Sequence, residues 1–265
     1  MENLYCTIIQ TSLAWEDKAA NLEMLGKKIL AIKDKTHIVI LPEMFSTGFS
    51  MKPEILAESM DGATVAWMKD MAKNKKIILT GSLMIKENNA YYNRLLWVLP
   101  NGEIGFYDKR HLFGYGKEDE HYTPGKTRMI VSVNGWKINL QVCYDLRFPV
   151  WARQHMQENS NKVEYDVLVY VANWPEKRSH AWKSLLIARA IENQCYVIGV
   201  NRVGNDGNDI YHSGDSMVIG PLGEIIFERS NDECVQTISL DKSILDNVRN
   251  QFPFLSDADN FSISN

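Results

Sequence analysis

One cysteine, Cys143, lies where an apolar segment runs into a turn. The segment Ile138–Val142 is typical of a buried strand, and Pro149 shortly after it is typical of the first turn of a helix. A thiol at a strand end that faces a helix N-terminus can have a lowered pKa and act as a nucleophile. A lone cysteine in an apolar strand is more often a small buried residue. This segment alone therefore favours simple burial, and the decision rests on the rest of the chain.

Two charged residues follow other predicted strands in the same way. Glu43 comes after the apolar segment His37–Leu41, and Lys109 comes after Ile104–Tyr107. Each also has an ordinary explanation. A glutamate after a proline can cap a helix, and Lys109 belongs to a run of charged residues, which usually lies on the solvated surface. The informative observation is that a thiol, a carboxylate and an ammonium each follow the end of a strand.

The segments that must position these residues alternate between buried strands, helices and hairpins. We expect strands at residues 4–10, 37–41, 77–83, 91–99, 104–107, 128–133, 136–142, 167–171, 196–200, 215–219, 225–227 and 233–240, and helices at 15–31, 64–74, 149–158, 179–194 and from 241. Asn134-Gly135 between two apolar strands is a strong hairpin signal. No Pro/Gly/Ser-rich linker or repeat interrupts the pattern. It predicts a single domain over residues 1–265, a layered α/β sandwich with mixed sheets.

Composition and charge limit the class of partner. The chain of 265 residues is 45% hydrophobic and 23% charged, as in a globular protein with a substantial core, and its net charge of -4 argues against nucleic acid or an anionic membrane. The N-terminus has no signal-peptide pattern, and no segment is long enough to span a bilayer. The four cysteines form no CxxC pair, which favours free thiols in a reducing compartment and therefore a cytoplasmic location.

Two glycine-containing segments lack what a nucleotide-binding loop needs. A phosphate-binding loop at Gly125-Lys126-Thr127 would require glycine at position 120, where Glu120 stands. Gly114-Tyr115-Gly116 lacks the third glycine of a dinucleotide fingerprint. The six histidines include no HExxH and no helical pair. We therefore expect no metal and no nucleotide cofactor.

Six blocks of the chain together resemble the nitrilase superfamily of carbon–nitrogen hydrolases. Three of them carry Glu43, Lys109 and Cys143 in the chain order of that superfamily's Glu-Lys-Cys triad. The blocks are 41–45 (LPEMF), 107–113 (YDKRHLF), 141–149 (QVCYDLRFP), 169–175 (VYVANWP), 188–194 (ARAIENQ) and 214–224 (GDSMVIGPLGE). The resemblance covers nearly the whole chain. It is closest to the bacterial ω-amidase branch, marked by 42–49 (PEMFSTGF), 109–113 (KRHLF), 193–197 (NQCYV) and 199–202 (GVNR).

The resemblance implies hydrolysis of an amide through a cysteine thioester. Cys143 would be the nucleophile, and Glu43 would act as general base and acid, which requires it to be buried. Lys109 would stabilise the oxyanion together with the backbone N–H of Tyr144. Glu118 matches a second glutamate of the superfamily and would pair with Lys109 or position the amide. Its acidic neighbours at positions 119 and 120 leave this assignment open by a residue or two.

Residues that would contact the substrate are less clearly marked. Asn173 and Trp174 match a strand end that lines the superfamily's pocket, although Trp174 can equally be a packing residue. A small anionic substrate needs a cation for its carboxylate, and the sequence does not choose among three arginines. The full set of candidate substrate-binding residues is Phe45, Asn173, Trp174, Arg147, Arg178 and Arg202.

Several other polar or thiol side chains have structural explanations. Arg189 and Glu192 are three apart on a predicted helix and should form an ion pair. Cys195 should be buried, as should Cys6 and Cys234. Asp145 beside the nucleophile should hold its turn through a salt bridge with Arg147.

The resemblance implies an ω-amidase that hydrolyses small 2-oxo dicarboxylate monoamides, such as 2-oxoglutaramate or 2-oxosuccinamate, to the diacid and ammonia. One alternative is another amidohydrolase of the same fold, acting on N-carbamoyl amino acids or aliphatic amides or, less expectedly, a true nitrilase. A different kind of alternative is an inactive binding scaffold, against which the three filled triad positions argue.

The superfamily fold is an α-β-β-α sandwich that usually pairs into αββααββα dimers. We therefore expect this fold with mixed sheets and a homodimer or higher homo-oligomer. The tail, about residues 251–265, contains several apolar residues and should pack on the body or on a partner subunit.

Overall fold

Two β-sheets form the centre of the protein. The computed structural model describes residues 2–154, 156–157, 162–259 and 261–263. In the six-stranded sheet the order is β15-β1-β2-β3-β4-β5: Cys234–Leu240, Leu4–Gln10, Ile38–Ile40, Ile78–Glu87, Ala90–Val98 and Ile104–Asp108. In the seven-stranded sheet the order is β12-β13-β11-β10-β7-β6, with β14 also paired to β13: Val203–Asn205, Tyr211–Ile219, Tyr196–Val200, Val167–Val171, Trp136–Val142, Met129–Val133 and Ile225–Ser230. A two-stranded sheet joins β8 (Met156–Gln157) and β9 (Lys162–Val163).

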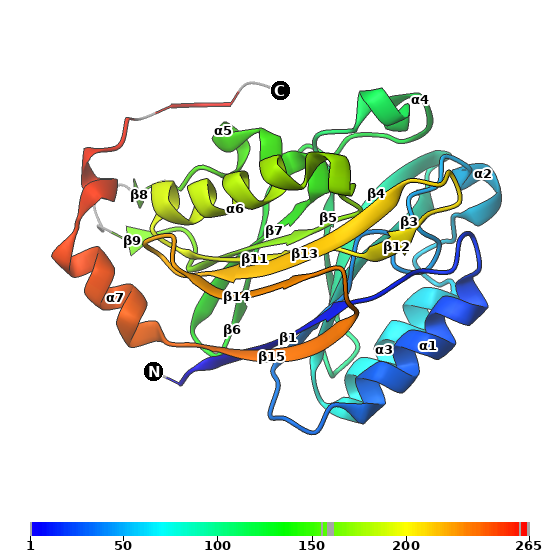
Figure 1. Ribbon diagram of the computed structural model, residues 1–265, viewed down its shortest axis with the longest axis horizontal. Helices are drawn as coiled ribbons and strands as arrows, with labels where there is room; N and C mark the ends of the chain where they lie inside the picture. Colours follow the sequence, from blue (N-terminus) through cyan, green and yellow to red (C-terminus); the bar gives the residue numbers. More distant parts are fainter. Residues whose placement is uncertain (1, 155, 158–161, 260, 264–265) are drawn as a thin grey trace.

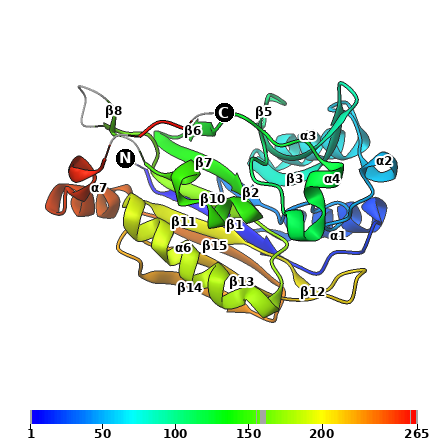
Figure 2. The same cartoon turned by 90° about the horizontal axis from the view of Figure 1, so that it is seen from above.

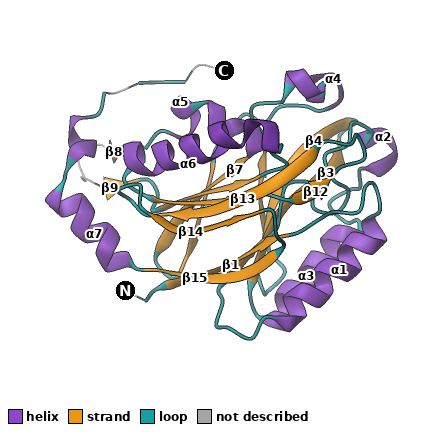
Figure 3. Ribbon diagram, viewed as in Figure 1, coloured by secondary structure: helices purple, strands orange, loops and turns teal. Residues whose placement is uncertain are grey.

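Helices cover the outer face of each sheet and complete the α-β-β-α sandwich that was predicted (Figures 1 and 2). α1 (Lys18–Ala31) and α3 (Ala63–Lys75) lie over the six-stranded sheet, and α6 (Ser179–Asn193) lies over the seven-stranded one (Figure 3). The other helices are α2 (Pro53–Leu56), α4 (Glu118–His121), α5 (Pro149–Ala152) and α7 (Lys242–Gln251), with 3-10 turns at Gly114–Gly116, Cys143–Arg147, Glu176–Arg178 and Phe254–Asp257. None of the described helices is both long and apolar enough to cross a bilayer.

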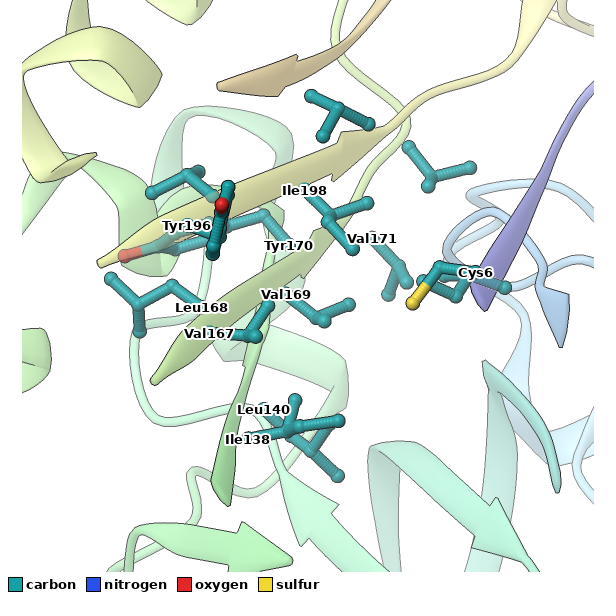
Figure 4. Close-up of a cluster of buried hydrophobic side chains, with 14 of the residues drawn as sticks. Cys6, Ile138, Leu140, Val167, Leu168, Val169, Tyr170, Val171, Tyr196 and Ile198 are labelled. Atoms are coloured by element: carbon teal, nitrogen blue, oxygen red, sulfur yellow. The ribbon is translucent and has the colours of Figure 1, made fainter. Parts of the chain in front are cut away.

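Apolar side chains from both sheets meet in the interior of the sandwich. β10 is buried along its whole length, and its side chains alternate between the two faces of its sheet. Figure 4 shows Val169 and Val171 on the side of Cys6 of β1, while Leu168 and Tyr170 point the other way. On that other side α6 presents a buried stripe at helical spacing: Trp182, Leu186, Arg189, Ala190 and Asn193.

The carboxyl ends of parallel strands deliver the polar residues to one place. β1, β2 and β3 are parallel in one sheet, and β7, β10 and β11 are parallel in the other. Glu43 follows β2, Cys143 follows β7 and Asn173 follows β10. Lys109 follows β5, which is antiparallel to β4, and its N–H donates to the carbonyl oxygen of Asn93 at 3.0 Å. Because parallel strands end at a common edge, residues far apart in sequence converge there.

Most predicted elements lie where the sequence indicates, and one helix was wrong. The helix expected from Pro149 to Glu158 ends at Ala152 and is followed by β8, with residues 155 and 158 outside the described part of the chain. The backbone leaves the helical region at Arg153, whose ψ is 131°. In the tail, Leu255 is buried whereas Phe254 is exposed, and residues 260 and 264–265 lie outside the description. The predicted Arg189–Glu192 ion pair is confirmed at 3.1 Å.

Candidate active site

Glu43 and Lys109 form an ion pair with no exposure to solvent. The ammonium of Lys109 lies 2.8 Å from Oε1 of Glu43, and both side chains are fully buried. The second carboxylate oxygen of Glu43 accepts the backbone N–H of Asn173 at 2.8 Å, while the Asn173 side-chain amide donates back to the Glu43 carbonyl. Glu43 is thus held from both sheets, because Lys109 follows the six-stranded sheet and Asn173 the seven-stranded one.

Glu118 completes a buried cluster of two carboxylates and one ammonium. Its Oε2 accepts from Lys109 at 2.8 Å and from the backbone N–H of Phe113 at 2.7 Å. Burial alone would lower the pKa of Lys109, but attraction by Glu118 and Glu43 outweighs it and raises that pKa above the ordinary range. Burial raises the pKa of Glu118, with Lys109 opposing the shift. Of the three consecutive acids, only Glu118 is buried, so the structure selects it for this cluster.

Cys143 opens a 3-10 helix, Cys143–Arg147, immediately after β7. It has a positive φ of 44°, which is uncommon for a residue other than glycine and turns its side chain out of the strand direction. Its Sγ lies 4.0 Å from the carbonyl oxygen of Asn173. The expectation of a lowered thiol pKa was wrong. Burial and then the negative charge of Glu43 raise the pKa of Cys143 well above its ordinary value, although Lys109 opposes this.

The nucleophile turn is held from below by Asp145. Its carboxylate accepts the backbone N–H of Val142 at 3.0 Å and the hydroxyl of Tyr107 at 2.8 Å. It also pairs with the ring of His111 at 2.8 Å, and that ring is stacked on Phe148. The expected partner of Asp145 was therefore wrong. It pairs with His111 rather than with Arg147, whose side chain extends into the pocket described next.

A cavity of about 520 Å³ opens above the thiol. Cys143, Lys109 and Asn173 lie at its floor, and Tyr144, the residue after the thiol, also lines it. Because the first N–H groups of a helical turn have no partner within the turn, the backbone N–H of Tyr144 is a candidate donor for an oxyanion. Aromatic rings make up much of the wall: Trp15, Phe49, Phe113, Tyr115, Tyr144 and Trp174. A cavity of this kind suits a small organic ligand.

Two of the three candidate arginines reach the cavity. The guanidinium of Arg147 lies 4.9 Å from the ring centroid of Trp174, and that of Arg178 lies 5.2 Å from the ring of Phe113. Within the described residues neither guanidinium has a carboxylate partner. Trp174 lines the cavity and also has a structural role, since its indole N–H donates to the Arg178 carbonyl at 2.8 Å.

Arg202 and Phe45 lie outside the cavity. Arg202 is buried, and its guanidinium donates to the carbonyls of Val203 and Asn205, so it holds the hairpin that follows it. Burial lowers the pKa of Arg202 to about 10. Phe45 is fully buried and packs on Trp67, because the turn at Met44, with a φ of 43°, directs it away from the site.

Sequence reasoning missed Asn93 and the N-terminal wall of the cavity. Asn93 lies inside β4, and its amide donates to Oε1 of Glu43 at 2.8 Å and to Oε1 of Glu118 at 3.0 Å. The available signal was an asparagine among the residues of a largely apolar strand, where a buried amide requires polar partners. Trp15 was assigned to a helix that begins only at Lys18, so it was not expected to line a cavity.

This geometry fits attack by a thiol on a planar carbonyl. A carboxylate is available to accept the thiol proton, a fixed ammonium lies beside it, and a cavity brings the substrate to the sulfur. Attack by the sulfur requires removal of the thiol proton, for which the carboxylate of Glu43 is available.

Comparisons with known proteins agree with this chemistry. Residues 6–250 match the family model for carbon–nitrogen hydrolases. The omega-amidase YafV of Escherichia coli K12 is 42% identical over 264 residues, 99% of this chain and 100% of that protein. The 2-oxoglutaramate amidase of Bacillus subtilis is 33% identical, over 85% of this chain and 86% of its own.

A solved structure extends the match to three dimensions. The crystal structure of XC1258 from Xanthomonas campestris, a CN-hydrolase superfamily protein with an arsenic adduct in its active site, superposes with a TM-score of 0.97. It is 43% identical and covers 100% of both chains. The chain described here belongs to the carbon–nitrogen hydrolase family, within the nitrilase superfamily.

Proposed function

We propose that this protein is an ω-amidase that hydrolyses the terminal amide of small 2-oxo dicarboxylate monoamides, with 2-oxoglutaramate as the leading substrate. The observation that carries the proposal is the buried cluster of Glu43, Lys109 and Glu118 beside the Cys143 thiol. It lies under a cavity with two arginines that have no carboxylate partner in the described part of the chain. The similarity to an omega-amidase and to a 2-oxoglutaramate amidase supports the choice of substrate.

The reaction proceeds through two tetrahedral intermediates. Cys143 Sγ forms a bond to the amide carbon while its proton moves to the Glu43 carboxylate. Lys109 and the Tyr144 N–H stabilise the oxyanion. Collapse breaks the C–N bond, and Glu43 returns the proton to the nitrogen, which leaves as ammonia.

The second half of the reaction regenerates the thiol. Glu43 removes a proton from water, and the resulting nucleophile attacks the thioester carbon. The C–S bond then breaks, the acid departs and Cys143 recovers its proton. Glu118 holds Lys109 in place, since its oxygens accept from that ammonium, from the Phe113 backbone N–H and from the Asn93 amide.

Arg147 and Arg178 bind the substrate carboxylate in this proposal. Each lies on an aromatic ring at the wall of the cavity, which holds the guanidinium in place without neutralising its charge. Charged groups that lack a carboxylate partner in a cavity favour an anionic ligand. Asn173 and Trp174 complete the binding surface around the acyl chain.

A coupled assay of ammonia release tests the substrate. We expect turnover of 2-oxoglutaramate and much slower turnover of the neutral amide of the same chain length. Turnover of N-carbamoyl amino acids with none of 2-oxoglutaramate would replace the ω-amidase proposal by the related amidohydrolase. Absence of turnover with every amide, nitrile and carbamoyl compound would favour the inactive scaffold.

The wider setting of the enzyme is also a proposal. We infer a single catalytic domain over residues 1–265 that works in the cytoplasm, supported by four free cysteines. We further infer a homodimer, supported by exposed Val150 and Phe254 beside α5 and the tail. Light scattering that gives the mass of one chain at micromolar concentration would contradict the dimer.

A further inference from the structure

We propose that Asn93 is a positioning residue that makes Glu43, rather than Glu118, the proton acceptor for Cys143. This inference rests on the proposed thiol chemistry and adds to it a selection between two adjacent buried carboxylates. Its basis is the distribution of hydrogen-bond donors over the four carboxylate oxygens.

Both oxygens of Glu118 are saturated. Each carboxylate oxygen has about two lone-pair sites. Oε1 of Glu118 accepts from Asn93 Nδ2 at 3.0 Å and from Lys109 Nζ at 3.0 Å. Oε2 accepts from Lys109 at 2.8 Å and from the Phe113 backbone N–H at 2.7 Å. Glu118 therefore cannot receive a proton without giving up an existing hydrogen bond.

Glu43 differs at one oxygen. Its Oε1 accepts from Lys109 at 2.8 Å and from Asn93 at 2.8 Å, which occupies both sites. Its Oε2 accepts only the Asn173 backbone N–H among the described residues, at 2.8 Å. The Cys143 Sγ lies 4.0 Å from the carbonyl oxygen of Asn173, the same residue whose N–H contacts Oε2, so the thiol lies beside this carboxylate. The free site on Oε2 is thus the place where the proton is received.

Asn93 completes this selection, because it takes the last open site on Oε1 of each carboxylate and leaves only Oε2 of Glu43 open. Its two Nδ2 hydrogens go to Oε1 of Glu43 and Oε1 of Glu118, so one amide bridges both carboxylates. Its Oδ1 is buried with no partner among the described residues. The opposite amide orientation would place Oδ1 against two carboxylate oxygens, so electrostatics fixes the observed one. An unpaired buried oxygen is the cost of holding both carboxylates with one donor.

Removal of this donor should affect the titration of the site. The charged groups around Glu43 are Lys109 and Glu118, with the Cys143 thiol and the Tyr122 hydroxyl as neutral titratable neighbours. A hydrogen bond to a carboxylate stabilises its charged form, so its loss raises the carboxylate pKa. The pH profile of a rate that depends on this carboxylate should therefore change in the variant.

The test follows the rate of Cys143 alkylation by iodoacetamide against pH in the full-length protein, so it needs no assumption about the natural amide. We expect Asn93→Ala to slow alkylation at neutral pH by about 10-fold or more, as part of what a positioned base contributes. We expect its pH profile to change as well. Asn93→Asp, which keeps the side-chain volume, should slow alkylation at least as much as Asn93→Ala, because a carboxylate has no N–H to donate.

A matched control and a double variant separate positioning from packing. Asn139→Ala removes another buried strand asparagine, which accepts from Gln141 at 2.9 Å and contacts none of these carboxylates, and should leave the pH profile unchanged. In a Glu43→Gln background, Asn93→Ala should reduce the alkylation rate little further, because both substitutions act through the Glu43 carboxylate. Unchanged pH profiles in both Asn93 variants, or fully additive losses with Glu43→Gln, would overturn the proposal. Thermal melting of each variant identifies any that fails to fold.

Discussion

The floor and the mouth of the cavity differ in how their charges are satisfied. At the floor, Lys109 lines the cavity and contacts two carboxylates beneath it, Glu43 and Glu118, at 2.8–3.0 Å with no solvent exposure. Arg147 and Arg178 are half-buried in the cavity wall, a region called the mouth below; they rest on aromatic rings and have no carboxylate partner among the described residues. The difference teaches that the reacting groups are organised before substrate arrives, whereas the anchoring groups are completed by the substrate itself.

The largest effect should come from removing the base at the floor. Glu43→Gln keeps the size of the side chain but cannot accept the thiol proton. We expect kcat/KM for ammonia release to fall by about 10²–10⁴, the range for a positioned general base. The readout is the coupled ammonia assay on purified protein with an unchanged melting temperature. A loss below tenfold would show that Glu43 is not the base.

Removing the charge of Lys109 at the floor should destabilise the fold far more than removing an arginine at the mouth. Lys109→Met leaves two buried carboxylates without their counter-charge, and we expect the free energy of unfolding to fall by about 3–5 kcal/mol. Arg178→Gln at the mouth should cost only about 1 kcal/mol or less, the value for a cation on an exposed ring. Urea unfolding of the two variants at neutral pH checks this. Equal losses would contradict the distinction between the two regions.

Removing a mouth cation should weaken substrate binding more than it slows the chemical step. For Arg147→Gln and Arg178→Gln we expect KM for 2-oxoglutaramate to rise by about 10- to 100-fold, the loss of one hydrogen bond to a charged group. The values for a neutral amide of the same length should not change. Arg110→Gln is the matched control, because Arg110 also lies on an aromatic ring, Trp151 at 5.1 Å, but outside the cavity. An equal rise in KM for the charged and the neutral amide would show that these arginines do not bind the substrate carboxylate.

The smallest effect concerns His212, a buried histidine at the edge of the cavity. Burial, with a contribution from Arg202, lowers its pKa to about 4, below the ordinary histidine value of 6.5. The unfolded chain therefore binds more protons between these two values, and stability is lost as the pH falls below 6.5. Between pH 7.5 and 5.5 the loss assigned to this group is about 1 kcal/mol. Urea unfolding at both pH values should show a smaller loss of unfolding free energy in His212→Gln than in the unmodified protein. An equal loss in the two proteins would contradict the role assigned to His212.

The sequence predicts the parts of the site that lie at strand ends. Strands Leu4–Gln10, Trp136–Val142, Val167–Val171 and Tyr196–Val200 have the bounds expected from their apolar composition. Parallel pairing then brings the residues after them to one edge, and the resemblance to the nitrilase superfamily supplied the combination of Glu43, Lys109 and Cys143. A regular strand and its end are local properties, and for this reason a single sequence reveals them.

The sequence does not predict features that depend on which atoms face each other across the fold. Asn93 looks like any polar residue within a strand, and its role depends on two carboxylates 50 and 25 residues away. Arg202 has the same charge as Arg147, but its own hairpin carbonyls engage it first. The raised pKa of Cys143 reverses the expectation drawn from a nearby helix, because burial and the charge of Glu43 outweigh that effect.

The central claim is that Cys143 forms a thioester on the way to the acid. The direct measurement is intact-protein and peptide mass spectrometry after rapid acid quenching during turnover of 2-oxoglutaramate. The account predicts an adduct on the Cys143 peptide with the mass of the substrate less ammonia, and no adduct or turnover in Cys143→Ala. Turnover that persists in Cys143→Ala, or an adduct on any other residue, would contradict it.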